Sequence, residues 1–241
     1  MIPKRIIYTW FGKKQIPEDF LKFKETWEKY NPDFEILEIN ENNFDVNSFN
    51  FTKQAYDSGK MAFVSDVARI WAINHYGGIY LDTDVEVLKS LKNLLTYRQF
   101  WAKEDAGFVA TGLAFGSVKD DPVLKEILDA YSNLEFTSNN LEELSTVHII
   151  SNILRKYGLK DNRETNILNN KGIVFAPEFF APYHYWGGGK VTKKTITIHH
   201  YSDRPSWTNK NKSAFNFIVH EIMYWIPALG RCLRWIKKKF H

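Results

Sequence analysis

The segment from Phe63 to Asp84 reads FVSDVARIWAINHYGGIYLDTD, and its first part has the pattern of a buried helix. From Met61 to Tyr76 the only charged residues are Asp66 and Arg69, and apolar residues occupy nearly every helical face, as in buried helices. An unpaired charge there would cost several kcal/mol. Because Asp66 and Arg69 stand three residues apart, they share a helix face and are expected to pair or to bind a ligand.

A strand that ends in two carboxylates follows the Gly77-Gly78 break. The period of two places Tyr80 and Asp82 on one face, and Asp84 can return beside Asp82. Converging carboxylates repel each other unless a cation lies between them, and hard oxygen ligands suit Mg²⁺ or Mn²⁺ with positions left open for phosphate. A lone Asp-x-Asp is often a turn or a solvated pair. The buried helix and apolar strand before it favour a metal site at Asp82 and Asp84.

The composition is that of a folded protein with one large domain, or one domain and an appendage. The 241 residues are 44% hydrophobic and 16% aromatic, and the formal net charge is +4. The single cysteine, Cys232, excludes an internal disulfide and a cysteine-rich zinc site, and it indicates a reducing compartment. We find no signal peptide and no transmembrane run, and no basic stripe suited to nucleic acid outside the tail. These features predict a cytoplasmic protein.

The amino end predicts a strand–helix–strand unit and therefore a parallel start to an α/β sheet. The first strand lies within 2–12, a helix covers 17–30, and a second strand covers 34–39. Trp10 falls at the carboxyl end of the first strand, where open α/β sheets bind ligands. It is either a platform for a nucleotide base or an ordinary core residue.

The middle of the chain alternates further strands and helices. We expect helices at 53–57, 122–131 and 141–157, a helical turn at 91–95, and extended segments at 85–88, 100–104, 112–117 and 173–177.

Residues 195–201 alternate as a strand that ends in the pair His199-His200. A twist or bulge at a strand end can direct either imidazole into a site. Such pairs are otherwise surface or capping residues.

The carboxyl end changes composition. Apolar residues recur at helical spacing from Phe215, and Pro227 divides the stretch into two helices. The second helix carries a basic cluster of Arg231, Arg234, Lys237, Lys238 and Lys239 beside Trp235 and Phe240. Two interpretations remain open: residues 215–241 lie on an anionic membrane surface, at the cytoplasmic face of the inner membrane, or they pack on the domain.

The motif Ser65-Asp66-x-x-Arg69 with Tyr76-Gly77-Gly78-Ile79-Tyr80-Leu81-Asp82-Thr83-Asp84 closely resembles the signature of the DxD sugar transferases of glycosyltransferase family 32. This family includes capsular and lipopolysaccharide enzymes and is related to the catalytic domains of large clostridial glucosylating toxins. The resemblance runs from residue 2 to about 207. It implies a Rossmann-like GT-A domain at 1–210, with a mixed sheet flanked by helices. Residues 211–241 lie outside the resemblance, and their helical spacing predicts a helical appendage.

The resemblance also implies a retaining hexosyltransferase that uses Mn²⁺ or Mg²⁺ and a nucleotide-sugar donor, with UDP-sugar expected. The implied acceptor is a glycan or lipid-linked oligosaccharide in surface polysaccharide synthesis. Asp66 matches the carboxylate that holds sugar hydroxyls, and Arg69 the cation beside the sugar and diphosphate. Asp82 and Asp84 match the DxD carboxylates, with Asp84 as direct metal ligand. Trp10 matches the aromatic residue that stacks on uracil, and Tyr80 matches a residue near the ribose and phosphate. His200 matches a metal ligand, with His199 as fallback. Ser206 and Trp207 match the pair that closes over the β-phosphate.

Asp203-Arg204-Pro205 departs from the shorter turn of many relatives, so the register of this last segment stays open. Because no carboxylate stands out as a nucleophile, we expect front-face substitution rather than double displacement. Three other readings are kept: transfer to a protein acceptor, a metal-dependent phosphoesterase (phosphatase or nuclease), and a non-catalytic nucleotide- or glycan-binding module.

Overall fold

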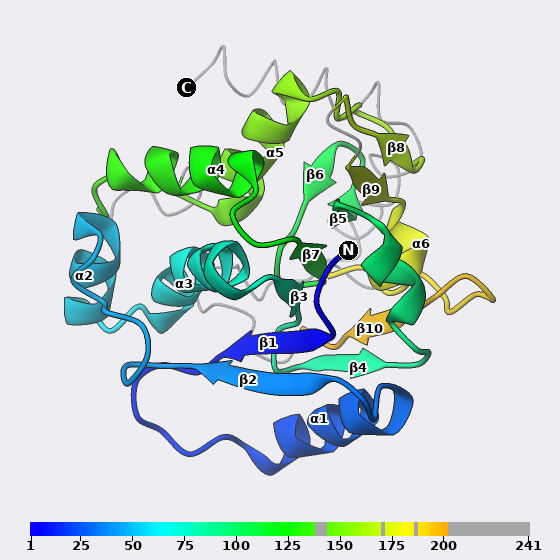
Figure 1. Cartoon of the computed structure of the whole chain (residues 1–241), viewed down its shortest axis with the longest axis horizontal. Coiled ribbons are helices and arrows are strands. Elements are labelled where there is room, and N and C mark those ends of the chain that lie inside the picture. The colour runs from blue at the N-terminus through cyan, green and yellow to red at the C-terminus, as the bar shows by residue number, and fades with distance from the viewer. Residues whose placement is uncertain (138–143, 170–171, 186–187, 202–241) are drawn as a thin grey trace.

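The computed structural model of the chain describes residues 1–137, 144–169, 172–185 and 188–201 (Figure 1). The expectations for Ser206, Trp207, the domain boundary near 210 and the two helices of 215–241 lie outside these residues.

A mixed sheet forms the centre of the molecule, as predicted. Its parallel part is β2 (Glu35–Ile39), β1 (Arg5–Thr9) and β3 (Gly78–Tyr80), with β1 in the middle. The sheet continues through β7 (Phe115–Ser117), β5 (Gln99–Asp105), β9 (Ile173–Phe175) and β8 (Asn166–Ile167), and β6 (Phe108–Val109) pairs with β5. β7 runs antiparallel to both β3 and β5, and β9 runs parallel to β5.

Two apolar clusters cover the two faces of this sheet. Because strand side chains alternate between faces, Ile7 joins one cluster while Ile6 and Tyr8 join the other. The Ile7 side is covered by α2 (Asn50–Asp57), α3 (Met61–Tyr76), α4 (Pro122–Ser132) and α5 (Thr146–Lys156). The other side is covered by α1 (Glu18–Tyr30), a 3₁₀ helix (Lys92–Thr96), α6 (Pro177–Phe180) and a small sheet of β4 (Val85–Val87) and β10 (Thr197–His199) (Figure 1).

The predicted buried helix is α3, and the turn from α3 into β3 depends on its two glycines. Gly77 has φ 66° and Gly78 has φ 135°, and residues other than glycine rarely adopt these backbone angles. A β-carbon would also lie 2.9 Å from Pro3 Cγ at Gly77, and 2.9 Å from the Arg5 carbonyl oxygen at Gly78. The turn therefore brings α3 and the end of β3 close together.

Most predicted elements are confirmed, with shifted ends. The helix expected at 53–57 already begins at Asn50, and within the described residues the one expected at 141–157 begins at Thr146. The strand expected at 195–201 is restricted to Thr197–His199, and both Thr195 and Thr197 are fully buried. Thr195 tolerates burial because its hydroxyl donates to the carbonyl of Glu178.

Lys103 is fully buried in the middle of β5. Its Nζ donates to the carbonyls of Lys160, Asn162 and Glu164 and to the side-chain oxygens of Asn162 and Asn166. This single ammonium therefore fixes the 160–166 segment against the sheet. Burial lowers the pKa of Lys103 to about 8, opposed by the charges of Asp161 and Glu164.

Within the part of the chain that the structure describes, no helix is both long and apolar enough to cross a membrane.

Candidate active site

Arg69 lies between two carboxylates at the end of β3. Its Nη2 is 3.1 Å from Asp66 Oδ1 and 3.5 Å from Asp82 Oδ1, and the residue is only 6% exposed. Its Nε donates to the Ser65 carbonyl one helical turn back. The predicted pairing of Asp66 with Arg69 is thus present, and Asp82 joins the pair.

Tyr80 orients Asp82 from below. Its hydroxyl donates to Asp82 Oδ1 at 2.7 Å and lies 2.8 Å from the Thr9 hydroxyl, and its ring lies under the Arg69 guanidinium at 4.9 Å. The shared face predicted for Tyr80 and Asp82 is confirmed. Because Tyr80 is fully buried, its contacts here are with the protein, and its expected place near ribose and phosphate stays a prediction.

Asp82, Asp84 and His199 form a cluster whose potential ligand atoms all lie within 4.8 Å of one another. His199 Nε2 is 3.1 Å from Asp84 Oδ1 and 3.7 Å from Asp82 Oδ2. Backbone pairing brings these distant residues together: His199 lies opposite Val85 in the β4–β10 ladder, and the His200 N–H donates to the Asp84 carbonyl.

The cluster fits a divalent cation. Both ring nitrogens of His199 are buried, and neither makes a hydrogen bond of good geometry with a described residue, although two carboxylates face Nε2. Two aspartates and one imidazole are ligands that Mn²⁺ or Mg²⁺ accepts.

His200, the preferred ligand in the sequence analysis, lies elsewhere. Its ring stacks on Phe23 at 4.4 Å, and its Nε2 is 3.0 Å from Glu86 Oε2. The fallback residue His199 takes the place at the aspartates. Successive residues of a strand point to opposite sides, so only one of the two imidazoles can face Asp82 and Asp84.

The charges at the site shift several pKa values. Burial raises the pKa of Asp66 to about 6 against the opposing charge of Arg69. Burial would also raise the pKa of Asp82, but Arg69, His199 and the Tyr80 hydroxyl hold it well below its usual range. Burial would lower the pKa of His199, yet Asp84 and Asp82 raise it to about 10. A protonated His199 therefore supplies the positive charge that a metal would otherwise provide.

Gly112 is a site residue that the sequence analysis missed. A β-carbon there would lie 2.3 Å from Asp82 Oδ2 and 3.3 Å from Arg69 Nη1. The Gly112 carbonyl also accepts the backbone N–H of Asp82. A glycine before β7 suggested only a strand start, and nothing in the sequence linked it to Asp82.

Glu104 and Tyr201 are also close to the cluster and were not predicted. The rings of Tyr201 and His199 are 4.3 Å apart at 81°, and the buried Tyr201 hydroxyl lies beside the Glu104 carboxyl. Burial raises the pKa of Glu104 to about 7, opposed by the charge of His199. The sequence signal available for Glu104 was its charge at the end of the strand predicted at 100–104.

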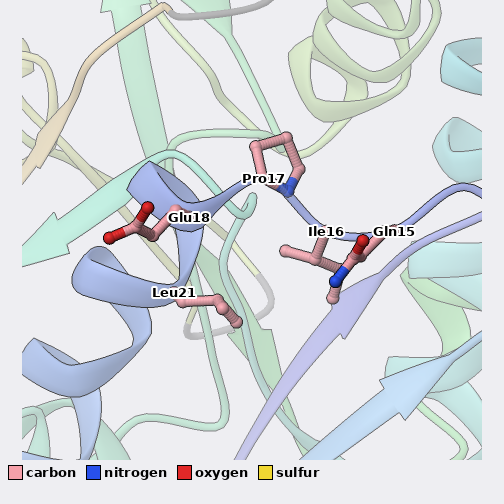
Figure 2. A pocket seen from close by; sticks show the side chains of 5 residues that line it. All are labelled: Gln15, Ile16, Pro17, Glu18 and Leu21. Atoms are coloured by element: carbon pink, nitrogen blue, oxygen red, sulfur yellow. The ribbon is translucent and has the colours of Figure 1, made fainter.

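Trp10 lies at the carboxyl end of β1, as predicted. Its indole N–H donates to the Lys14 carbonyl, and its ring packs edge-on against Phe20 at 5.8 Å. A pocket opens on the segment just after it, lined by Gln15, Ile16, Pro17, Glu18 and Leu21 (Figure 2). Asp82, Asp84 and His199 do not line this pocket. Stacking of Trp10 on a base stays a prediction.

Residues 17–101 match the family described as "Glycosyltransferase sugar-binding region containing DXD motif". This match contains Asp66, Arg69, Asp82 and Asp84. This segment of the chain therefore resembles the DXD sugar-binding region of glycosyltransferases. Inositol phosphoceramide mannosyltransferase 3 of Schizosaccharomyces pombe is 30% identical over 131 residues, which are 53% of this chain and 36% of that protein. The chain thus aligns with little more than a third of the length of this relative.

The solved structure of the PaToxG glycosyltransferase is similar in fold. Its TM-score is 0.56 at 21% identity, and the match covers 64% of this chain and 68% of that one. The likeness supports a GT-A fold for this chain.

Proposed function

We propose that this chain is a DXD glycosyltransferase that moves a sugar from a nucleotide-sugar donor, UDP-sugar being favoured, to a hydroxyl of a glycan or lipid-linked oligosaccharide. The observation that carries the proposal is the convergence of two sets of groups. The Arg69 guanidinium lies between Asp66 and Asp82, and Asp82 also belongs to the Asp84–His199 cluster. A donor with sugar hydroxyls next to a diphosphate needs such a combination.

Each residue has a role in this proposal. Asp66 accepts hydrogen bonds from donor sugar hydroxyls, and Arg69 faces the sugar and diphosphate. Asp82, Asp84 and His199 would hold Mn²⁺ or Mg²⁺, which supplies charge neutralisation for the diphosphate. Trp10 is assigned to the base, and Ser206 and Trp207 to the β-phosphate, from the family resemblance.

The proposed chemistry is front-face substitution with retention of configuration. The bond from the anomeric carbon to the acceptor oxygen forms on the same face on which the bond to the diphosphate oxygen breaks. The acceptor proton passes to the departing diphosphate. Arg69 assists because a fixed positive charge stabilises the negative charge that develops on the leaving group.

The direct test replaces Asp84 with Asn and titrates Mn²⁺ while sugar release from UDP- and GDP-sugars is measured. We expect a loss of about a hundredfold, the usual cost of removing one preorganised electrostatic contact. Glu86→Gln is the matched control, because Glu86 forms the neighbouring carboxylate–imidazole pair with His200 on the same two strands.

Near wild-type activity of Asp84→Asn would remove the metal assignment. Release of a nucleoside monophosphate and a sugar 1-phosphate, in place of a nucleoside diphosphate and free sugar, would favour a phosphoesterase, and binding without turnover would favour a non-catalytic module. GDP-mannose belongs in the screen, because the Schizosaccharomyces pombe relative is a mannosyltransferase by name. Its name also contains a lipid acceptor, so lipid-linked and protein acceptors should both be offered.

The assignment of residues 211–241 to a tail, with a membrane contact at 215–241 on the cytoplasmic face, is part of the proposal. Comparing flotation with anionic liposomes between the full chain and a chain ending at Ser213 tests it. Equal flotation would remove the membrane contact.

A further inference from the structure

Two tyrosines project from the segment that follows α6. Tyr183 is 43% exposed and Tyr185 is 37% exposed, whereas His184 between them is 7% exposed. This alternation places the two tyrosine side chains on the outer side of the segment and His184 on the inner side. We call Tyr183 and Tyr185 the aromatic face.

The backbone that carries the aromatic face folds back on itself. Tyr183 pairs with Gly189 in an antiparallel bridge, and the His184 N–H donates to the Gly188 carbonyl. Gly189 has φ 81°, and a β-carbon there would lie 2.1 Å from the Pro182 carbonyl oxygen.

A chain of ring contacts joins the aromatic face to the metal cluster. The Tyr185 ring is 6.4 Å from the Tyr201 ring, and Tyr201 in turn packs edge-on against His199 at 4.3 Å. Tyr201 has φ 52°, a conformation that is unfavourable for a bulky residue and that is concentrated at functional sites. The aromatic face thus borders the place where the acceptor hydroxyl must approach the donor.

The chemistry of this surface suits a sugar ring. A pyranose presents C–H groups on its faces and hydroxyls around its edge, and a tyrosine likewise combines an apolar ring with a polar hydroxyl. Tyrosine also provides a large rigid contact at low entropic cost. A lipid chain or apolar peptide would need a wider apolar area than two rings, and the neighbouring Lys190 is exposed and charged.

We infer that Tyr183 and Tyr185 form the acceptor subsite, on which a saccharide ring stacks beside the Asp82–Asp84–His199 cluster. This inference rests on the proposed transferase function and specifies where its acceptor binds. It assigns the aromatic face no part in donor binding.

The test measures saccharide binding and donor use separately. Saturation-transfer NMR with methyl hexopyranosides, maltose, lactose and cellobiose, in Mn²⁺ with UDP or GDP, reports which ring protons contact the protein. Sugar release from nucleotide sugars, with water as acceptor, reports donor use. We expect Tyr185→Ala and Tyr183→Ala to weaken saccharide binding at least fivefold and to leave donor hydrolysis within twofold of wild type.

Two controls sharpen the result. Tyr185→Phe keeps the ring and should bind within twofold of wild type, and a fivefold loss in this variant would overturn stacking. Ile167→Ala removes a 69% exposed apolar side chain on β8 and should change nothing. Two outcomes would overturn the subsite alone, provided that the wild type hydrolyses donor. Either both alanine variants bind saccharide as well as the wild type does, or the wild type binds no saccharide at all. Absence of hydrolysis in wild type would instead count against the proposed function.

Discussion

Asp82 occupies the space that a side chain at position 112 would fill: a β-carbon on Gly112 would lie 2.3 Å from Asp82 Oδ2. The φ of Gly112 lies outside the left-handed region, so the role of this glycine is steric rather than conformational. Because position 112 has no side chain, the Asp82 carboxylate can face both Arg69 and the other two members of the cluster, Asp84 and His199.

Gly112→Ala is therefore expected to displace the Asp82 carboxylate and to lower turnover about a hundredfold, because a misplacement of about 1 Å can cost that much. Steady-state kinetics with the best donor of the screen measures this. Gly59→Ala is the control: unlike Gly112, Gly59 has a positive φ, and its β-carbon would meet nothing within 4 Å. It should lose some thermal stability and keep its turnover. Equal turnover in the two variants would contradict the steric role.

His199→Ala should weaken Mn²⁺ binding at least tenfold, since it removes the nitrogen that faces both aspartates. His200→Ala should bind Mn²⁺ within twofold of wild type, because His200 pairs with Glu86 and stacks on Phe23. Calorimetric titration of Mn²⁺ into each variant decides between them. The reverse order of affinities would return the ligand role to His200.

Glu104→Gln should stabilise the metal-free protein in a manner that depends on pH. Burial raises the pKa of Glu104 to about 7, above the value near 4.5 of an unfolded chain, so between these values the native state binds more protons. The contribution of Glu104 to the free energy of unfolding of the wild type is thus lost as pH rises from about 4.5 to about 7. Glutamine cannot ionise, so its advantage in Tm should grow over this window and then level off.

Thermal melts in chelator between pH 4.5 and 8.5 measure the effect of Glu104→Gln. Glu25→Gln, at an exposed position on α1, is the control and should show no such trend. A Tm difference that stays constant with pH would mean that Glu104 ionises in the folded protein as it does in water.

Lys103→Met should lower the free energy of unfolding by about 3–5 kcal/mol, because it leaves buried oxygens of the 160–166 segment without their donor. Urea denaturation measures this loss. Lys156→Met removes an exposed ion pair with Glu126 and should cost no more than about 1 kcal/mol. Similar losses in both variants would show that the ammonium contributes little.

Local chemistry explains which site residues were predictable from the sequence. Asp66 and Arg69 stood out because a charge on an otherwise apolar helix requires a partner, and Asp82 followed from the two-residue period of a short strand. Both signals lie within one continuous segment. The parallel start of the sheet likewise follows from strand–helix–strand spacing, and the structure confirms it.

The remaining site residues depend on contacts between distant segments. Whether His199 or His200 faces the aspartates is set by the register of β10 on β4, which alternation within 195–201 does not fix. Gly112 acquires its role only from the position of Asp82, and Lys103 only from acceptors some sixty residues later. Sequence periodicity describes one element at a time, so it cannot supply such pairings.

The β4–β10 ladder makes the cation cluster a late product of folding. Asp84 and His199 are joined across more than a hundred residues, so the entropy of closing a loop of nearly half the chain must be lost before these ligands meet. Long-range pairings of this kind form slowly. A ribosome-bound chain that has not yet released residues 197–199 carries the complete DXD segment and still lacks the third ligand. Tight cation binding should consequently emerge only after residues 197–199 have been released and have paired with β4.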